Sequence, residues 1–139
     1  MKNTRFIVLA ALFGALAVLF GAFGAHALKA PLSTEQLASY QTGVSYHFYH
    51  TFALLITGIW YAQTGNSRLR WAAMAFAVGI VLFSGSIYLL ACKDLLHLGG
   101  FTKIIGPVTP LGGLFFIAGW VFLGLAAGAR PRPRPRPRV

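Results

Sequence analysis

The stretch from Phe6 to Ala25 reads FIVLAALFGALAVLFGAFGA and holds no charged or strongly polar side chain. An α-helix needs about 20 such residues to cross the hydrocarbon core of a bilayer. Three further runs are mostly apolar: Val44–Ala62, Trp71–Cys92 and Ile104–Ala127. No strand-like alternation competes with them, and lipid permits only helices or closed barrels. The sequence therefore predicts an all-α, four-helix transmembrane bundle.

The composition excludes the other broad classes of protein. The chain has 139 residues, of which 57% are apolar and only 10% are charged, with 12 Lys and Arg against 2 Asp and Glu. A soluble domain carries about 25% charged residues, and a disordered chain is far less apolar. The single Cys92 excludes an internal disulfide and a Cys-rich zinc site.

We expect one membrane domain over residues 1–128, with spans at about 6–28, 34–63, 70–92 and 104–127. The second span begins earlier than its apolar part. Ser33 is followed three residues later by Gln36, the pattern of a capping box, and Pro31 marks the break before it. The second helix is therefore predicted to start near Thr34.

Basic residues predict the orientation, because Lys and Arg accumulate on the cytoplasmic side. Nine of them fall on the side that holds the two termini and three on the other, so we expect both termini in the cytoplasm. The larger group is Lys2, Arg5, Arg68, Arg70 and the five tail arginines, and the smaller group is Lys29, Lys93 and Lys103.

A cleaved signal peptide is the alternative interpretation of the N-terminal segment. Lys2 and Arg5 precede an apolar stretch that ends in Ala25-His26-Ala27, which resembles a cleavage site. The apolar stretch is longer than the usual 7–15 residue core of a signal peptide. We therefore favour a retained first span.

The polar residues inside the spans are informative, because they are costly in a membrane. With this orientation they are predicted to gather near the outer leaflet, where they form a candidate polar or ligand-binding cluster. Its members are His26, His47, His50, Ser84, Tyr88 and Thr109.

One stripe of the second span is more polar than the rest of that helix. Residues three and four positions apart share a helical face, and we expect this face to point into the bundle. The stripe is Gly43, His47, His50, Thr51, Leu54, Thr57, Gly58 and Tyr61.

His26, His47 and His50 admit more than one role. Imidazole is a common ligand of metals and haem, but no carboxylate follows in the stripe to tune these rings. We favour hydrogen bonds across helices to Tyr, Ser or a backbone carbonyl. Quinone contact and proton relay stay open, the metal is left unknown, and no cofactor is predicted.

Catalytic motifs are weak. Ser84-Gly85-Ser86 is not a nucleophile elbow, and Cys92 beside Lys93 is typical of an inert interfacial thiol. Glu35 and Asp94, the only acids, lie on different segments. We expect no enzyme activity.

The segment 129–139 alternates Arg and Pro, which prevents a helix. Its charges favour anionic lipid headgroups at about 1 kcal/mol per residue. The alternative is a disordered tail that only fixes orientation, and no nucleic-acid partner is expected, because no aromatic platform accompanies the charge. The arginines are Arg130, Arg132, Arg134, Arg136 and Arg138.

Four stretches together resemble a known family: Gly21–Leu28 (GAFGAHAL), Tyr46–His50 (YHFYH), Phe83–Leu90 (FSGSIYLL) and Thr109–Gly113 (TPLGG), the last followed by Gly119-Trp120. They are similar to the bacterial domain-of-unknown-function-423 family, whose eukaryotic relatives are called transmembrane protein 256. The resemblance implies a small multi-pass protein of the bacterial inner membrane. It implies no established activity.

Small residues recur along the first span, and Gly124 with Gly128 forms a Gly-xxx-Gly pair on the fourth, which supports a tight bundle and self-association. We therefore expect a non-enzymatic scaffold or an accessory subunit of a membrane complex, with a membrane-protein partner or a second copy. The alternatives are the outer-leaflet ligand site and transport of a small solute or proton by an oligomer.

Overall fold

The computed structural model describes residues 3–128, and every regular element in that range is helical. The first two helices are α1 (Arg5–Ala25) and α2 (Thr34–Thr64). A continuous rod follows, made of α3 (Ser67–Gly79), the π-helix η1 (Ile80–Ser84) and α4 (Gly85–Ala91). The last part holds the 3₁₀ turn η2 (Gly99–Phe101), the short α5 (Thr102–Ile105) and α6 (Val108–Ala127). These elements confirm the predicted all-α fold with four long helical rods.

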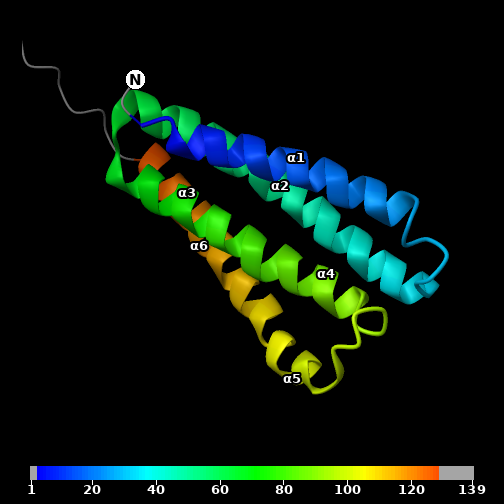
Figure 1. Ribbon diagram of the computed structural model, residues 1–139. Coiled ribbons are helices and arrows are strands. Elements are labelled where there is room, and N and C mark those ends of the chain that lie inside the picture. The colour runs from blue at the N-terminus through cyan, green and yellow to red at the C-terminus, as the bar shows by residue number, and fades with distance from the viewer. Residues whose placement is uncertain (1–2, 129–139) are drawn as a thin grey trace, which may run out of the picture.

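The rods pack in chain order, α1 on α2, α2 on the α3–α4 rod, and α3 on α6 (Figure 1). The start of α1, the α2–α3 turn and the end of α6 lie at one end of the bundle. The α1–α2 connection and the segment around α5 lie at the other end. An even number of passes therefore brings both described chain ends together.

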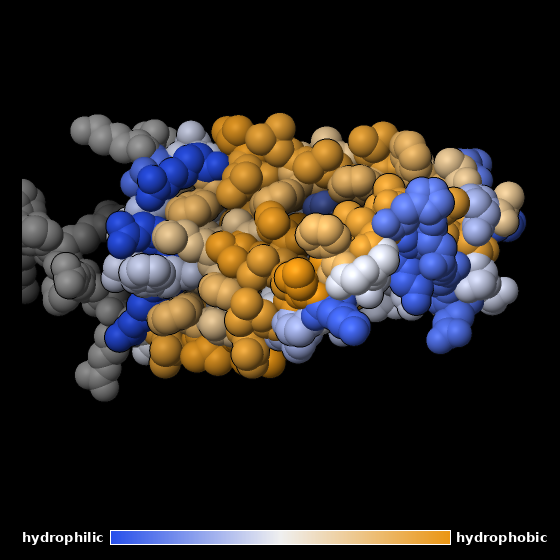
Figure 2. Space-filling model, turned by 60° about the horizontal axis from the view of Figure 1, so that its bottom comes forward, coloured by the Kyte–Doolittle hydropathy of each residue, from blue (hydrophilic) through white to orange (hydrophobic). Residues whose placement is uncertain are grey.

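The length of the helices and the apolar character of the surface suit a lipid bilayer. α1, residues Ser67–Ala91 and residues Gly99–Ala127 are long and apolar enough to span a membrane. Figure 2 shows a broad apolar belt with hydrophilic side chains at both ends. α2 does not meet the same test of composition, because its polar residues lower its hydropathy. Its outward face is nevertheless apolar, with Tyr49, Phe52, Ile56 and Ile59 exposed.

Local signals explain where the helices begin. The Ser33 side chain accepts from the Gln36 backbone N–H at 3.1 Å, and the Gln36 side chain accepts from the Ser33 N–H at 3.0 Å. This confirms the capping box and the start at Thr34. Asn66 caps the third rod by accepting from the Arg68 N–H. This rod therefore begins at Ser67, whereas the predicted span began at about residue 70.

Two predicted boundaries differ from the structure for identifiable reasons. α1 ends at Ala25 instead of about residue 28, because the Leu28 N–H donates to the Phe23 carbonyl at 3.0 Å and closes the last turn. The fourth rod is broken near its start instead of running straight from residue 104. Pro107 follows Gly106 at the break, and a proline has no N–H to continue a helical ladder.

Glycines set the closest helix contacts. Gly79 lies against the Phe116 ring, and in reverse Gly119 lies against the Phe76 ring. A side chain on Gly112 would clash with the backbone nitrogen of Phe83. α6 thus meets the α3–η1 rod at backbone distance, the contact that small residues allow in membrane helices.

Candidate functional site

The polar stripe of α2 is buried along its whole length. All eight residues predicted to face the bundle interior are inaccessible in the structure, which confirms that prediction. The stripe also accounts for four of the six buried polar residues in the described part of the chain; the six are His47, His50, Thr51, Thr57, Ser84 and Ser86. Hydrogen-bonding groups are therefore concentrated on the α2 side of the interior, while the rest of the core is apolar and includes Leu69, Phe76 and Ile80.

His50 is held by three neighbours. Its Nδ1 lies 2.8 Å from the Tyr46 carbonyl, and its Nε2 lies 3.3 Å from the indole nitrogen of Trp120. Indole is only a donor, so Nε2 accepts and Nδ1 carries the proton. The ring stacks on Phe116, with centroids 3.4 Å apart and planes 8° from parallel. Both nitrogens are occupied, so a metal or haem could bind His50 only after these bonds break.

His47 has a different environment. Its Nδ1 lies 3.1 Å from the Tyr88 hydroxyl, and its ring packs against Phe13 and Phe20 of α1. The His47 side chain is 3% exposed, and its Nε2 has no hydrogen-bond partner in residues 3–128. A buried polar atom left unpaired costs about 1–3 kcal/mol. Among the described residues His47 Nε2 shares this state with the hydroxyls of Thr51, Thr57 and Ser84.

Tyr88 extends the cluster around His47. Its ring lies 4.8 Å from Phe20 and 4.9 Å from Tyr40. The Tyr40 hydroxyl in turn donates to the Phe20 carbonyl at 3.0 Å. Side chains from α1, α2 and α4 therefore meet in one aromatic cluster around the His47–Tyr88 pair.

Ser86 joins the third rod to the fourth. Its hydroxyl lies 2.6 Å from the Thr109 hydroxyl and 2.9 Å from the Phe83 carbonyl. Phe83 belongs to η1, and π-helical segments occur often at functional sites. Ser84, in the same segment, is fully buried, and its hydroxyl has no partner among the described residues. Thr109 is therefore hydrogen-bonded to Ser86, a residue that the predicted cluster did not include.

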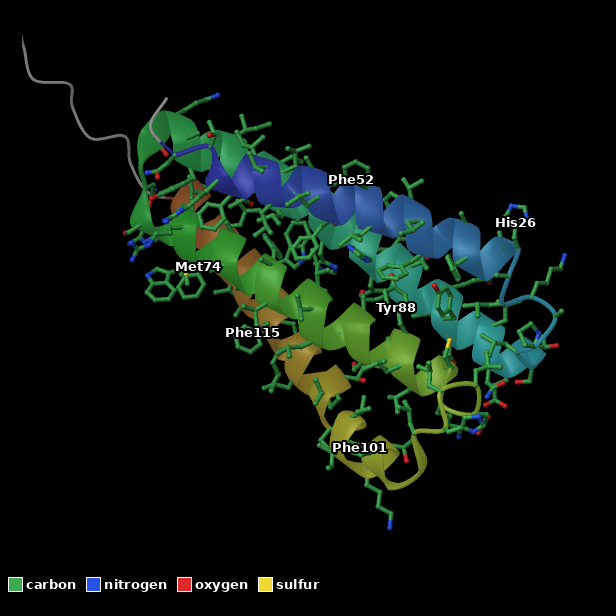
Figure 3. The ribbon with its side chains drawn as sticks, viewed as in Figure 1. His26, Phe52, Met74, Tyr88, Phe101 and Phe115 are labelled. Carbon is green, nitrogen blue, oxygen red and sulfur yellow. The ribbon has the colours of Figure 1, made fainter. Side chains whose placement is uncertain are left out.

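The predicted cluster is divided in the structure. His26 is exposed at the end of α1, far from the Tyr88 region of the bundle (Figure 3). His47 lies level with Phe13 and Phe20, inside the bundle and not at its outer mouth. The reason is that α2 starts at Thr34, so the histidines that open its apolar part fall near the middle of the helix. In residues 3–128 no three His, Cys, Asp or Glu side chains lie close enough to hold a metal ion.

Sequence reasoning missed the aromatic partners. Tyr46, Phe116 and Trp120 surround His50, and Tyr40 completes the surroundings of Tyr88. The sequence carried one signal, since Trp120 lies in a motif of the resemblance. Which histidine it meets depends on how α6 packs against the bundle, and helical periodicity does not report that.

Cys92 lies outside the spans, at the end of α4. Burial raises the pKa of the Cys92 thiol above its usual range, which is opposite to the lowering that a neighbouring Lys93 could produce. A thiol with a raised pKa is a poor nucleophile at neutral pH. The tail arginines proposed to bind lipid headgroups lie outside the described residues.

The structure defines a class of protein, a small helical membrane bundle whose mostly apolar interior holds a polar and aromatic cluster. The chain matches the family described as "Protein of unknown function (DUF423)" over residues 20–113, and it belongs to that family. This confirms the resemblance seen in its motifs.

Three relatives illustrate the match. A UPF0382 membrane protein of Staphylococcus haemolyticus is 40% identical over 118 residues, which cover 85% of this chain and 90% of the relative. Bacillus subtilis YwdK is 38% identical over 88% of this chain and 94% of its own length. The inner membrane protein YgdD of Escherichia coli is 35% identical over 88% of each. No solved structure matches the chain. The predicted membrane class and inner-membrane location agree with these names.

The Trp120–His50 bond can be tested with a double-mutant cycle. Trp120→Phe and His50→Phe keep an aromatic ring and remove one partner of the bond each. We expect a coupling free energy of about 1 kcal/mol between them, measured by reversible unfolding in detergent. Trp120→Phe combined with His26→Phe is the matched control and should be additive. Equal coupling in both pairs would contradict the assigned bond.

Proposed function

We propose that this protein is a non-enzymatic membrane scaffold that serves as an accessory subunit of a larger membrane complex. One observation carries the proposal: the two buried histidines and Ser86 are bonded to side chains of other helices, which are Tyr88, Trp120 and Thr109. His50 has both nitrogens occupied, and Ser86 is bonded to Thr109. Groups used in this way stabilise a shape, and they are not free to act on a substrate.

The acidic residues support the same role. Glu35 and Asp94 are the only acids in the chain. The Asp94 carboxylate accepts from the Gln36 side chain at 2.7 Å and so joins the start of α2 to the segment after α4. General acid–base catalysis usually needs a positioned titratable pair. Here the Asp94 carboxylate instead holds two segments of the bundle together.

The outward face of α6 is the surface we assign to a partner helix. A side chain added at Gly124 would meet no atom within 4 Å, whereas Gly14, Gly21 and Gly24 of α1 all face α2. Small residues on an open face let another helix approach closely. Exposed apolar residues accompany Gly124 on α6; they are Leu114, Ile117, Val121 and Leu125.

The bundle's charge pattern supports an orientation with the termini in the cytoplasm. Among the described residues, Arg5, Arg68 and Arg70 lie on segments at the end where both chain ends meet. The opposite end carries Lys29, Lys93 and Lys103. The five tail arginines add to the first group and suit anionic lipids of the inner leaflet.

The accessory role predicts a stoichiometric partner. We expect in-membrane cross-linking, followed by purification in mild detergent, to recover the chain with a second protein or a second copy at a fixed ratio. Gly124→Leu should abolish that recovery without changing thermal stability, because nothing in the bundle occupies the space. Ala11→Leu, on the exposed face of α1, is the matched control. Recovery of the wild-type chain as a lone monomer would contradict the role.

Reporter fusions test the orientation. Alkaline phosphatase is active only outside the cytoplasm, and a fluorescent protein that fails to fold after export reports the inside. We expect fusions after Gly128 and in the 65–66 turn to report the cytoplasm, and a fusion near Lys29 to report the outside. The reverse pattern at these three positions would overturn the orientation.

A further inference from the structure

A groove of about 620 Å³ runs between α1 and the η1–α4 part of the third rod on the lipid-facing side of the bundle, with Ile105 and Val108 also lining it. Phe13, Leu16 and Phe20 form one wall, and Val81 and Leu89 belong to the other. Leu16, Val81 and Leu89 are each 40% or more exposed, so the groove opens sideways into the membrane. Its volume lies in the range of small-molecule sites, and its lining is almost wholly apolar.

Three polar residues line this groove: His47, Tyr88 and Ser86. The Ser86 hydroxyl is already bonded to Thr109. Tyr88 has one hydroxyl proton, and its only hydrogen bond within the described residues is to His47 Nδ1. The pairing is satisfied when the Tyr88 O–H donates and Nδ1 accepts. The imidazole proton then lies on Nε2, the buried nitrogen that has no partner in residues 3–128. His47 therefore carries, beside the groove, one covered N–H donor that no described residue accepts.

The depth of that donor restricts the occupant. A rise of about 1.5 Å per residue puts Phe13 about 12 Å and Phe20 about 22 Å from the start of α1. The His47 ring contacts both and so lies near the middle of a hydrocarbon core about 30 Å thick. Phospholipid esters and headgroups lie at the edges of that core. An acceptor that reaches His47 must belong to a neutral molecule able to dissolve in the core.

We propose that this groove binds a neutral, lipid-soluble carbonyl compound of the isoprenoid quinone class. A ring carbonyl accepts from His47 Nε2–H, the aromatic side chains Phe13, Phe20 and Tyr88 pack on the flat ring, and the isoprenoid tail follows the apolar walls toward lipid. The groove lies away from Gly124 and the outward face of α6, so the proposal does not depend on the accessory role assigned to that face.

Decylubiquinone is the probe, added to the full chain in phosphatidylcholine nanodiscs and followed by native mass spectrometry. We expect saturable one-to-one binding, weakened about tenfold by His47→Phe through the loss of one buried hydrogen bond. Gly85→Leu should weaken binding at least as much, because Gly85 lines the groove and a side chain there meets no atom within 4 Å. His26→Phe makes the same chemical change outside the groove and should bind like the wild type.

Decylbenzene, which has the same tail and no carbonyl, separates a specific site from general apolar affinity and should bind at least tenfold more weakly. The proposal is overturned if decylbenzene binds as tightly, if wild-type chains retain phosphatidylcholine in place of the quinone, or if both groove variants keep the wild-type Kd. Gly85→Leu leaves His47 intact, so the test stands even where His47→Phe fails to fold. Circular dichroism checks the fold of each variant.

Discussion

The structure depends on the need to pair the polar face of α2 inside a membrane. Lipid offers no hydrogen-bonding partners, so every donor and acceptor on that face must find one within the protein or remain at a cost. α2 meets this need by turning its apolar face outward, with Phe52 and Ile56 exposed, and its polar stripe inward. The other three rods then supply partners to His47 and His50 and shield the whole stripe from lipid, while the Thr51 and Thr57 hydroxyls stay buried without a partner among the described residues.

The packing of the other helices follows from that arrangement. Trp120 can donate to His50, and Phe116 can stack on it, only because α6 approaches closely. Gly112 and Gly119 permit that approach, the first against the η1 backbone and the second against the Phe76 ring. Polar pairing and close glycine contact therefore act together, since neither aromatic partner could reach the histidine across a wider gap.

Local chemistry made much of the fold predictable from sequence. Apolar run lengths predicted the four rods, the Ser33 capping box predicted the start of α2, and helical spacing predicted which face of α2 is buried. The contacts of the site were less accessible. His26 and His47 looked equivalent along the chain, yet they lie at different depths because each depth depends on where its helix begins. The Trp120–His50 pair joins residues 70 positions apart, and only tertiary packing decides that match.

Nitrogen-15 solid-state NMR of histidine-labelled protein in bilayers measures the pairing of α2 most directly. We expect His50 to show a protonated Nδ1 and an unprotonated, hydrogen-bonded Nε2 that correlates with the Trp120 indole N–H, with neither proton exchanging in D₂O over hours. A charged imidazolium at pH 7, or rapid exchange at Nδ1, would show that water reaches this face. The dry, internally bonded interior described here would then be contradicted.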